Sequence, residues 1–165
     1  MKGLVVGRFQ PLHYGHLHLI EYAASECDSL VVGVGSCNQS RTLDNPFTFG
    51  QRRKMIEDSL DIGVGFEVAG IPDFGDYDKW AAWIKSNLDF DVFFGNTGRE
   101  AGIFGKAGVK VISPPFHDRE RLNGTYIRGQ LLAGSDLSDL VPAPALKVVT
   151  ECGGQDLLRD IVESQ

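Results

Sequence analysis

The stretch GRFQPLHYGH, residues 7–16, joins a short apolar run to a segment with helical periodicity. The run Leu4–Val6 predicts a buried strand, and apolar side chains at helical spacing predict a helix from about Gly15 to Glu26. The strand therefore ends in glycine and leads His13 and His16 onto a helix N-terminus. Such a start offers unpaired N–H groups and the positive end of the helix dipole. The stretch predicts a site for a phosphate group.

The rest of the chain continues the alternation of apolar strands and helices. Two buried strands separated by one helix favour a parallel sheet with a right-handed crossover. The pattern predicts an α/β fold, a doubly wound, Rossmann-like, five-stranded parallel sheet with helices on both faces. The expected strands are Lys2–Val6, Ser29–Gly35, Phe66–Ile71, Asp91–Gly95 and Val109–Ile112. The later helices are expected to begin near Thr48, Lys79, Arg99, Gly124, the prolines at 142–144, and Gln155.

Length and composition limit the classes of protein to which the chain can belong. A chain of 165 residues fits one domain, so we expect a single domain whose C-terminal helical segment spans about 136–165. The net charge of −6 argues against non-specific nucleic-acid binding, which needs a basic face. No apolar run reaches the ~18 residues of a membrane span, and the three cysteines form no C-x-x-C pair. We therefore expect a soluble cytoplasmic protein with no nucleic-acid or membrane partner.

Polar and charged side chains follow the carboxyl ends of the expected strands. In open α/β sheets, that edge is where ligands bind. In chain order these side chains are Arg8, His13 and His16, then Asn38 and Arg41, then Asp73 and Trp80, then Asn96, with Arg128 at a later helix start. Loops that converge on one edge indicate a site more strongly than any single loop does.

The absence of several known motifs excludes the kinds of site that those motifs build. There is no P-loop, no G-x-G-x-x-G after the first strand, no G-x-S-x-G elbow and no zinc-like spacing of Cys and His. What remains is H-x-G-H at a helix start and scattered arginines, which suits a polyphosphate that is cleaved without a covalent intermediate. Gly15 lets a phosphate approach the backbone, and His16 can donate to a phosphate oxygen. We expect no metal site built from side chains.

An arginine is expected to hold the leaving pyrophosphate, because its planar fork binds phosphate oxygens bidentately. Arg128 is the first candidate, and Arg8, Arg41 and Arg52 are the alternatives.

Three segments resemble the archaeal-type nicotinamide-nucleotide adenylyltransferases, which belong to the H-x-G-H nucleotidyltransferase superfamily. They are GRFQPLHYGH at 7–16, NPFTFGQR at 45–52, and PP at 114–115 followed by GTYIR at 124–128. The resemblance runs from about Leu4 to Leu132. H-x-G-H alone identifies the superfamily, and the flanking residues narrow it to this family.

The resemblance implies transfer of AMP from ATP to nicotinamide mononucleotide (NMN), giving NAD and pyrophosphate, with Mg²⁺ accompanying ATP. It implies that His13, His16 and Arg128 are catalytic residues at the triphosphate and that Trp80 stacks on the nicotinamide ring. The residues that we assign to ATP are Gly7, Arg8, Phe9, His13, Gly15, His16, Arg41, Arg52, Gly124, Thr125, Ile127 and Arg128. Those that we assign to NMN are Asn38, Asp73, Trp80 and Asn96.

The attacking group in that reaction is a 5′-phosphate, which is already ionised at pH 7. We therefore expect catalysis by in-line positioning and charge stabilisation, without a strong general base. The family also implies a homo-oligomer.

Some positions depart from the family's pattern. Asn123 and Tyr126 stand where serine and glutamate are usual, and Arg41 replaces a common histidine. Tyr77 replaces an asparagine three residues before the stacking tryptophan, whereas Asp73 is retained. The alternatives are therefore another H-x-G-H enzyme (an FMN or phosphopantetheine adenylyltransferase, or a cytidylyltransferase) and a nucleotide sensor without turnover. The intact phosphate residues argue against the sensor.

Overall fold

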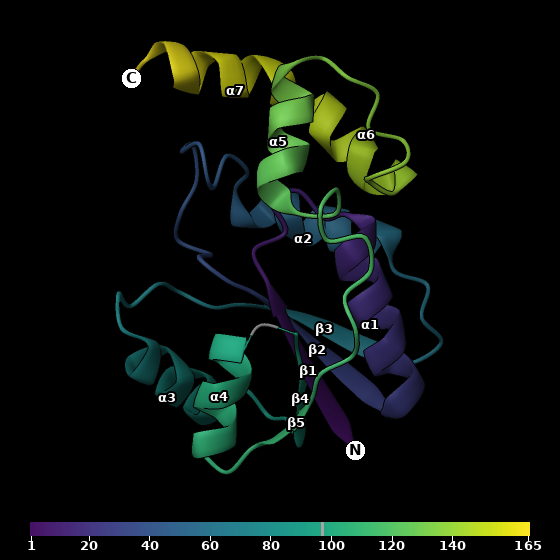
Figure 1. Cartoon of the computed structure of the whole chain (residues 1–165), viewed down its shortest axis with the longest axis vertical. Coiled ribbons are helices and arrows are strands. Elements are labelled where there is room, and N and C mark those ends of the chain that lie inside the picture. Colours follow the sequence, from purple (N-terminus) through teal and green to yellow (C-terminus); the bar gives the residue numbers. More distant parts are fainter. Residues whose placement is uncertain (97) are drawn as a thin grey trace.

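A computed structural model describes residues 1–96 and 98–165 and shows a five-stranded parallel sheet with helices on both faces (Figure 1). The strands are β1 (Lys2–Gly7), β2 (Ser29–Val34), β3 (Gly65–Gly70), β4 (Val92–Phe94) and β5 (Lys110–Ile112). The helices are α1 (Tyr14–Glu26), α2 (Phe49–Ser59), α3 (Tyr77–Asn87), α4 (Gly98–Lys106), α5 (Gly124–Leu132), α6 (Ala143–Glu151) and α7 (Gly154–Glu163). The expected fold is confirmed.

The sheet has the strand order β3-β2-β1-β4-β5, so β1 is the central strand. Gly3 of β1 pairs with Leu30 of β2 on one side and with Val92 of β4 on the other. The direction of the strand order reverses beside β1, and ligands of such sheets bind in the crevice outside the carboxyl ends at this reversal. The loop that follows β1, with the H-x-G-H motif, therefore lies at the crevice.

Successive residues of the strands supply two separate cores, because side chains of a strand alternate between the two faces of the sheet. Leu4 and Phe93 belong to a core completed by α3 and α4, which lie to the left of the sheet in Figure 1. Val5 and Phe94 belong to a larger core completed by α1 and α2. Both faces are thus covered, which explains why the three inner strands, β1, β2 and β4, contain continuous buried apolar runs.

The last three helices extend the larger core beyond the sheet. Leu131 of α5, Val149 of α6 and Leu158 of α7 all belong to it, and α6 packs on α2 while α7 packs on α5. This packing holds the first turn of α5 next to the loop after β1, where the Arg128 Nη1 donates to the carbonyl of Gln10 at 3.0 Å. Among the described residues, no helix has the length and apolar character needed to cross a bilayer.

Candidate active site

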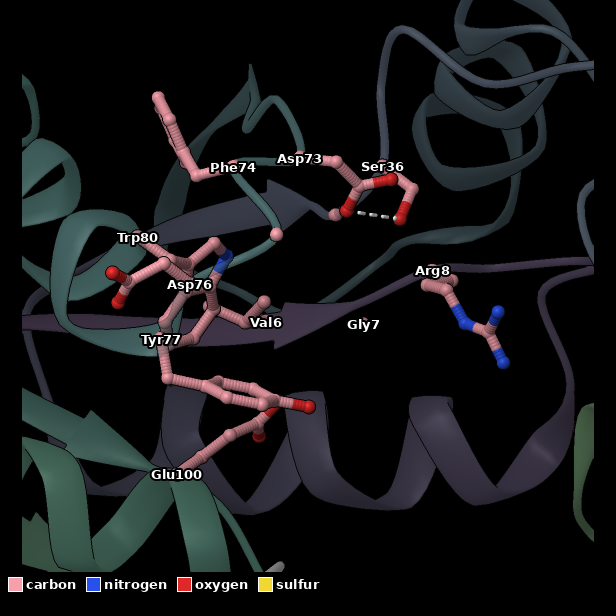
Figure 2. A pocket seen from close by; sticks show the side chains of 12 residues that line it. Val6, Gly7, Arg8, Ser36, Asp73, Phe74, Asp76, Tyr77, Trp80 and Glu100 are labelled. Carbon is pink, nitrogen blue, oxygen red and sulfur yellow. Dashed lines mark hydrogen bonds between the residues drawn. The ribbon is translucent and has the colours of Figure 1, made fainter.

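Two adjoining cavities lie at the carboxyl ends of the strands. The histidine cavity has a volume of about 510 Å³, and the residues that define it here are His13, His16, Asn96, Phe116 and Gly124. The tryptophan cavity has a volume of about 500 Å³, and the residues that define it are Ser36, Asp73, Asp76, Tyr77 and Trp80 (Figure 2). Val6, Gly7, Arg8 and Glu100 line both cavities. The end of β1 is therefore a shared floor that connects them.

His13 and His16 cap helix α1 reciprocally. Nδ1 of His13 accepts from the backbone N–H groups of Gly15 (3.1 Å) and His16 (3.4 Å), and Nδ1 of His16 accepts from the backbone N–H of His13 (3.2 Å). Because each Nδ1 is an acceptor, each neutral ring carries its proton on Nε2. The rings stack at 3.7 Å between centroids and both line the histidine cavity. The motif thus supplies two oriented Nε2–H donors for a phosphate.

Burial keeps both imidazoles neutral. Desolvation is the main cause that lowers the pKa of His13 to about 4, and the positive charge of Arg128 lowers it further. Burial likewise lowers the pKa of His16, with a smaller contribution from His13. An anion bound against these rings would favour their protonated forms. Binding of a polyphosphate is therefore coupled to the charge state of the motif.

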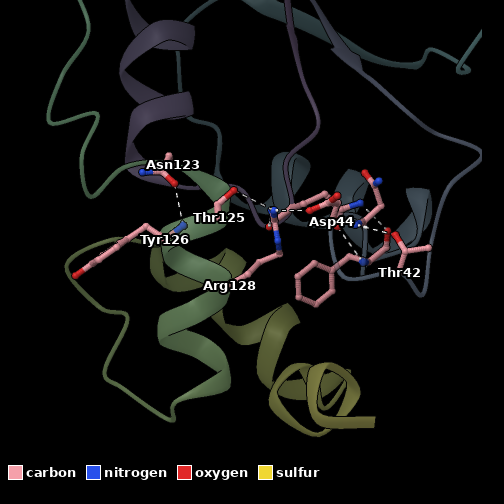
Figure 3. A network of polar contacts seen from close by, with 9 residues as sticks. Thr42, Asp44, Asn123, Thr125, Tyr126 and Arg128 are labelled. Carbon is pink, nitrogen blue, oxygen red and sulfur yellow. Dashed lines mark hydrogen bonds and ion pairs between the residues drawn. The ribbon is translucent and has the colours of Figure 1, made fainter. Parts of the chain in front are cut away.

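Arg128 lies in the middle of α5, is almost fully buried and is not among the residues that line either cavity (Figure 3). Besides its bond to the carbonyl of Gln10, its Nη2 lies 3.5 Å from the Thr125 hydroxyl and 3.6 Å from a carboxylate oxygen of Asp44. Burial lowers the pKa of Arg128, and the neighbouring Arg8 lowers it further. Two guanidinium groups thus form a local cationic site beside two neutral imidazoles that offer N–H donors, as anion binding in an acidic protein requires.

Two glycines keep this cationic site open. A Cβ atom on Gly124 would lie 2.6 Å from Nη1 of Arg128, and one on Gly15 would lie 2.8 Å from the ring of His13. Both separations are shorter than van der Waals contact, so a side chain at either position would displace a phosphate-binding group. The requirement for glycine is therefore one of space, because neither residue has a positive φ.

Arg52 is fully buried and does not line either cavity. Its guanidinium donates to the carbonyls of Arg8 (3.0 Å), Gly35 (2.8 Å), Ser36 (3.0 Å), Gln39 (3.3 Å) and Thr48 (3.3 Å). Burial lowers its pKa to about 10. The structure thus places Arg52 beneath the loops that follow β1 and β2, where it joins their backbones instead of facing a ligand.

Arg41 lies apart from the cationic site. Its side chain is exposed, contacts the carbonyl of Pro46 at 3.5 Å and borders a smaller cavity beside Asp160 and Ser164 of the α7 region. Phe9 and Ile127, also assigned to ATP from the sequence, have buried side chains. The ring of Phe9 packs 4.5 Å from that of His16, so it supports the motif from the core. Neither residue lines the histidine cavity or the tryptophan cavity.

The tryptophan cavity distinguishes the two tryptophans of α3. Trp80 lines the cavity and rests on Phe104 of α4 at 5.6 Å between ring centroids. Trp83 is not among the lining residues and packs against Phe74 at 6.2 Å. Asp73 lines the cavity and accepts from the hydroxyl of Ser36 at 2.9 Å (Figure 2). A flat ring that enters this cavity can reach Trp80.

The two asparagines assigned to NMN occupy different places. Asn38 is exposed and stays outside the lining of the tryptophan cavity, where its side-chain oxygen accepts from the backbone N–H of Asp73 at 3.1 Å. Asn96 lines the histidine cavity and donates to the carbonyl of Pro114 at 2.6 Å. Asn38 thus orients the loop that carries Asp73, and Asn96 lies on the side of the histidines.

Comparison with known proteins identifies the family. Residues 4–71 match the cytidylyltransferase-like family. The chain is 39% identical to the nicotinamide-nucleotide adenylyltransferase of Saccharolobus solfataricus, over 98% of this chain and 96% of that protein. It is 36% identical to the protein of that name from Methanothrix thermoacetophila, over 97% of this chain and 95% of the relative. The chain belongs to the nicotinamide-nucleotide adenylyltransferase family.

Solved structures agree with this membership at the level of the fold. A bifunctional NMN adenylyltransferase/ADP ribose pyrophosphatase from Francisella tularensis, complexed with AMP and a manganese ion, superposes with a TM-score of 0.79 at 22% identity. A second structure of the bifunctional protein gives 0.83 at 21% identity. The chain covers about half of each, 52%, while 98% of this chain is matched. The family and the enzyme class predicted from the sequence, a nucleotidyltransferase, are confirmed.

Several residues that line the cavities of this adenylyltransferase family member were not assigned to a ligand from the sequence, although Tyr77, Pro114 and Pro115 were named there for other reasons. In the tryptophan cavity they are Ser36, Phe74, Asp76, Tyr77 and Glu100, and in the histidine cavity they are Tyr22, Pro114, Pro115, Phe116 and Arg119. Ser36 and Pro114 lie two residues after the ends of β2 and β5, and their position after a strand is a signal that could have assigned them to the site. The others depend on how helices approach the sheet.

Proposed function

We propose that the protein transfers AMP from ATP to nicotinamide mononucleotide, giving NAD and pyrophosphate. The observation that carries this proposal is the shared floor of the two cavities. The histidine cavity offers donors for a polyphosphate, the tryptophan cavity offers an aromatic face for a flat ring, and Gly7 and Arg8 line both. An acceptor phosphate near Arg8 would meet the α-phosphate of ATP at this junction.

The residues suit direct in-line attack. The acceptor's 5′-phosphate is an anion at neutral pH and needs no base, so the protein has to align two anions and stabilise the charge on the leaving pyrophosphate. The Nε2–H groups of His13 and His16 donate to phosphate oxygens, and the guanidinium of Arg128 binds the far end of the triphosphate. Their fixed orientation, set by the reciprocal caps of α1 and by the bond of Arg128 to the carbonyl of Gln10, is what makes charge stabilisation effective.

One assay tests the proposal: pyrophosphate release from ATP or CTP, measured with NMN, nicotinic acid mononucleotide, FMN and phosphopantetheine as acceptors. We expect turnover with ATP and NMN, and formation of NAD in equal amount. Turnover with FMN alone, or with CTP in place of ATP, would contradict the proposal. No turnover with any pair would instead favour a nucleotide sensor.

A divalent cation, Mg²⁺, is proposed to accompany ATP. Of the described residues, no group of three or more His, Cys, Asp or Glu side chains is arranged to hold a metal ion. The triphosphate and water would therefore supply most of its ligands, a usual arrangement for Mg²⁺, and it would neutralise part of the phosphate charge. Loss of activity with excess chelator, restored by added Mg²⁺, is the expected result.

We further propose that the chain acts as one domain in a cytoplasmic homo-oligomer. The sharing of one core by α5, α6, α7 and the sheet supports the single domain. The exposed side chains of Leu43 and Val162 offer apolar surface for contact between copies. Light scattering of the purified protein tests the oligomer.

A further inference from the structure

The side chain of Gln10 connects three segments that are distant in the chain. It is buried, and its amide bonds twice to the backbone of Phe47: Nε2 donates to the carbonyl at 3.1 Å, and Oε1 accepts from the N–H at 2.9 Å. The backbone carbonyl of Gln10 accepts from Nη1 of Arg128 at 3.0 Å. Gln10 therefore joins the loop after β1 to the segment that precedes α2 and to α5.

The two bonds to Phe47 need a side chain that both donates and accepts. An amide does both, an ionised carboxylate only accepts, and an apolar side chain does neither. Phe47 is itself fully buried, so a lost partner would leave its backbone groups unsatisfied in the interior. The pairing thus holds the Gln10 side chain in one orientation and fixes the backbone that carries it.

The carbonyl of Gln10 is the buried anchor of the Arg128 guanidinium. Nη1 is bound there, while Nη2 faces the Thr125 hydroxyl and the carboxylate of Asp44 (Figure 3). That carboxylate is exposed, and the hydroxyl contact is long at 3.5 Å, so the carbonyl makes the best-defined contact of the three. Because a guanidinium binds phosphate oxygens in the plane of its fork, a shifted carbonyl would tilt the fork away from the triphosphate.

Gln10 lines neither the histidine cavity nor the tryptophan cavity. We propose that it is a positioning residue for adenylyl transfer, which acts through Arg128: its amide, held by Phe47, sets the place of the carbonyl on which the guanidinium rests. This role rests on the proposed function, because Arg128 matters here as the group that binds the triphosphate.

The first test is Gln10→Glu, compared with the wild-type enzyme over a range of pH. The ionised carboxylate cannot donate to the Phe47 carbonyl and repels it, whereas the neutral acid, which burial favours, donates and accepts as the amide does. We expect kcat/KM for ATP to lie about tenfold or more below the wild type at about pH 8, and within about threefold of it at about pH 6. The ratio to the wild type removes the pH dependence of the substrates.

Gln51→Glu is the matched control, because the side chain of Gln51 acts as an acceptor in its described contact. Its Oε1 accepts from the backbone N–H of Thr48 at 3.0 Å, in the capping box of α2. A carboxylate accepts equally well at a helix start, and the residue lines neither cavity. We expect the ratio of Gln51→Glu to the wild type to stay constant over the same range of pH.

A double-mutant cycle tests whether Gln10 acts through Arg128. Gln10→Met keeps most of the side-chain volume and removes both bonds to Phe47. It should lower kcat/KM for ATP by about tenfold or more on its own, and by less than about twofold in the Arg128→Met background. The Kd for ATP, measured by calorimetry on the same set of proteins, should follow the same pattern. Thermal unfolding corrects each value for the folded fraction.

The outcomes separate the positioning role from the reaction itself. Equal losses from Gln10→Met with and without Arg128 would overturn the positioning role, as would a Gln10→Glu deficit that is the same at every pH. A lower melting temperature with full kcat/KM would mean that Gln10 serves the fold alone. If Gln10→Met does not fold, the pH dependence of Gln10→Glu decides. A wild-type protein that binds ATP without releasing pyrophosphate would overturn the proposed function only, since the Kd values still test Gln10.

Discussion

The carboxylate of Asp44 lies 3.6 Å from the guanidinium of Arg128, at the position proposed for the end of the triphosphate. The Asp44 side chain is 75% exposed and that of Arg128 is 7% exposed. An exposed anion thus pairs with a buried cation that the proposed nucleotide site would use (Figure 3). In the proposed complex, ATP displaces this carboxylate so that its own oxygens can reach Arg128.

Replacing Asp44 by Asn should therefore strengthen ATP binding. An exposed ion pair contributes up to about 1 kcal/mol, so the KM for ATP should fall by up to about fivefold with kcat unchanged. Steady-state kinetics at low and high salt check this, since screening should reduce the effect. Asp58→Asn removes a similar surface ion pair, with Lys54 on α2, and should leave the KM unchanged. A higher KM in Asp44→Asn would mean that Asp44 assists the nucleotide.

Removing the His16 side chain should slow the chemical step. One lost donor to developing charge typically costs on the order of 10²–10³ in kcat. Single-turnover pyrophosphate release from His16→Ala measures this loss, and thermal unfolding confirms that the variant is folded. Glu21→Ala is the matched control on the same helix, because the exposed Glu21 lies outside the capping motif and lines neither cavity. Full kcat in His16→Ala would exclude the proposed role.

We expect Arg52 to contribute mainly to the stability of the fold rather than directly to catalysis. Arg52→Met would leave several buried carbonyls without a donor, and we expect a loss of at least about 3 kcal/mol in the free energy of unfolding. Arg53→Met is the matched control, because Arg53 is exposed and pairs only with Glu57 among the described residues, at 2.7 Å. Its effect should stay below about 1 kcal/mol. Urea unfolding of both variants compares them, and equal losses would contradict the buried role of Arg52.

Replacing two glycines of α5 with alanine, one at a time, should have opposite effects. Gly124→Ala would push the Arg128 guanidinium aside, so kcat/KM for ATP should fall by about tenfold or more. A Cβ atom on Gly129 meets no other atom within 4 Å. Gly129→Ala should keep full activity and stabilise the helix by about 0.5–1 kcal/mol. Kinetics and unfolding of the two variants measure both effects, and full activity in Gly124→Ala would show that Arg128 is not needed where it lies.

His13 should make the fold sensitive to acid. Its pKa is about 4 in the folded protein, below the ordinary value of 6.5. As pH falls from 6.5 to 4, the unfolded chain takes up a proton that the folded protein does not, so the folded state loses on the order of 3 kcal/mol over this window. His13→Asn keeps a helix cap and should flatten this dependence. Urea unfolding at a series of pH values tests it, and identical slopes would contradict the burial effect.

The sequence could predict most of the framework because local rules and tertiary packing agree there. Thr48 was expected to cap a helix, and its hydroxyl accepts from the backbone N–H of Gln51 at 3.2 Å. The order of strands and helices, and the place of H-x-G-H after the first strand, follow from apolar periodicity alone. The loops at the carboxyl ends of the strands could therefore be named before their shapes were known.

The parts that could not be predicted depend on the path of the chain in space. Arg41 and Arg52 are eleven residues apart and were both alternatives for the phosphate in the sequence, yet Arg52 turns inward, where backbone carbonyls surround it, and Arg41 is exposed. Tyr77 and Glu100 reach the tryptophan cavity because the starts of α3 and α4 lie side by side there. Asn96 lies with the histidines for a similar reason, since its bond to Pro114 holds it on that side.

The central place of β1 affects how the chain acquires activity during its synthesis. β1 pairs with β2 early, but its other partner, β4, begins at Val92, and Arg128 bonds to Gln10 across 118 positions. Contacts between such distant segments form late, because the intervening chain must first be ordered or closed as a loop. A growing chain on the ribosome thus carries His13 and His16 long before it carries their arginine. The nascent protein should remain unable to consume ATP until α5 has emerged and docked.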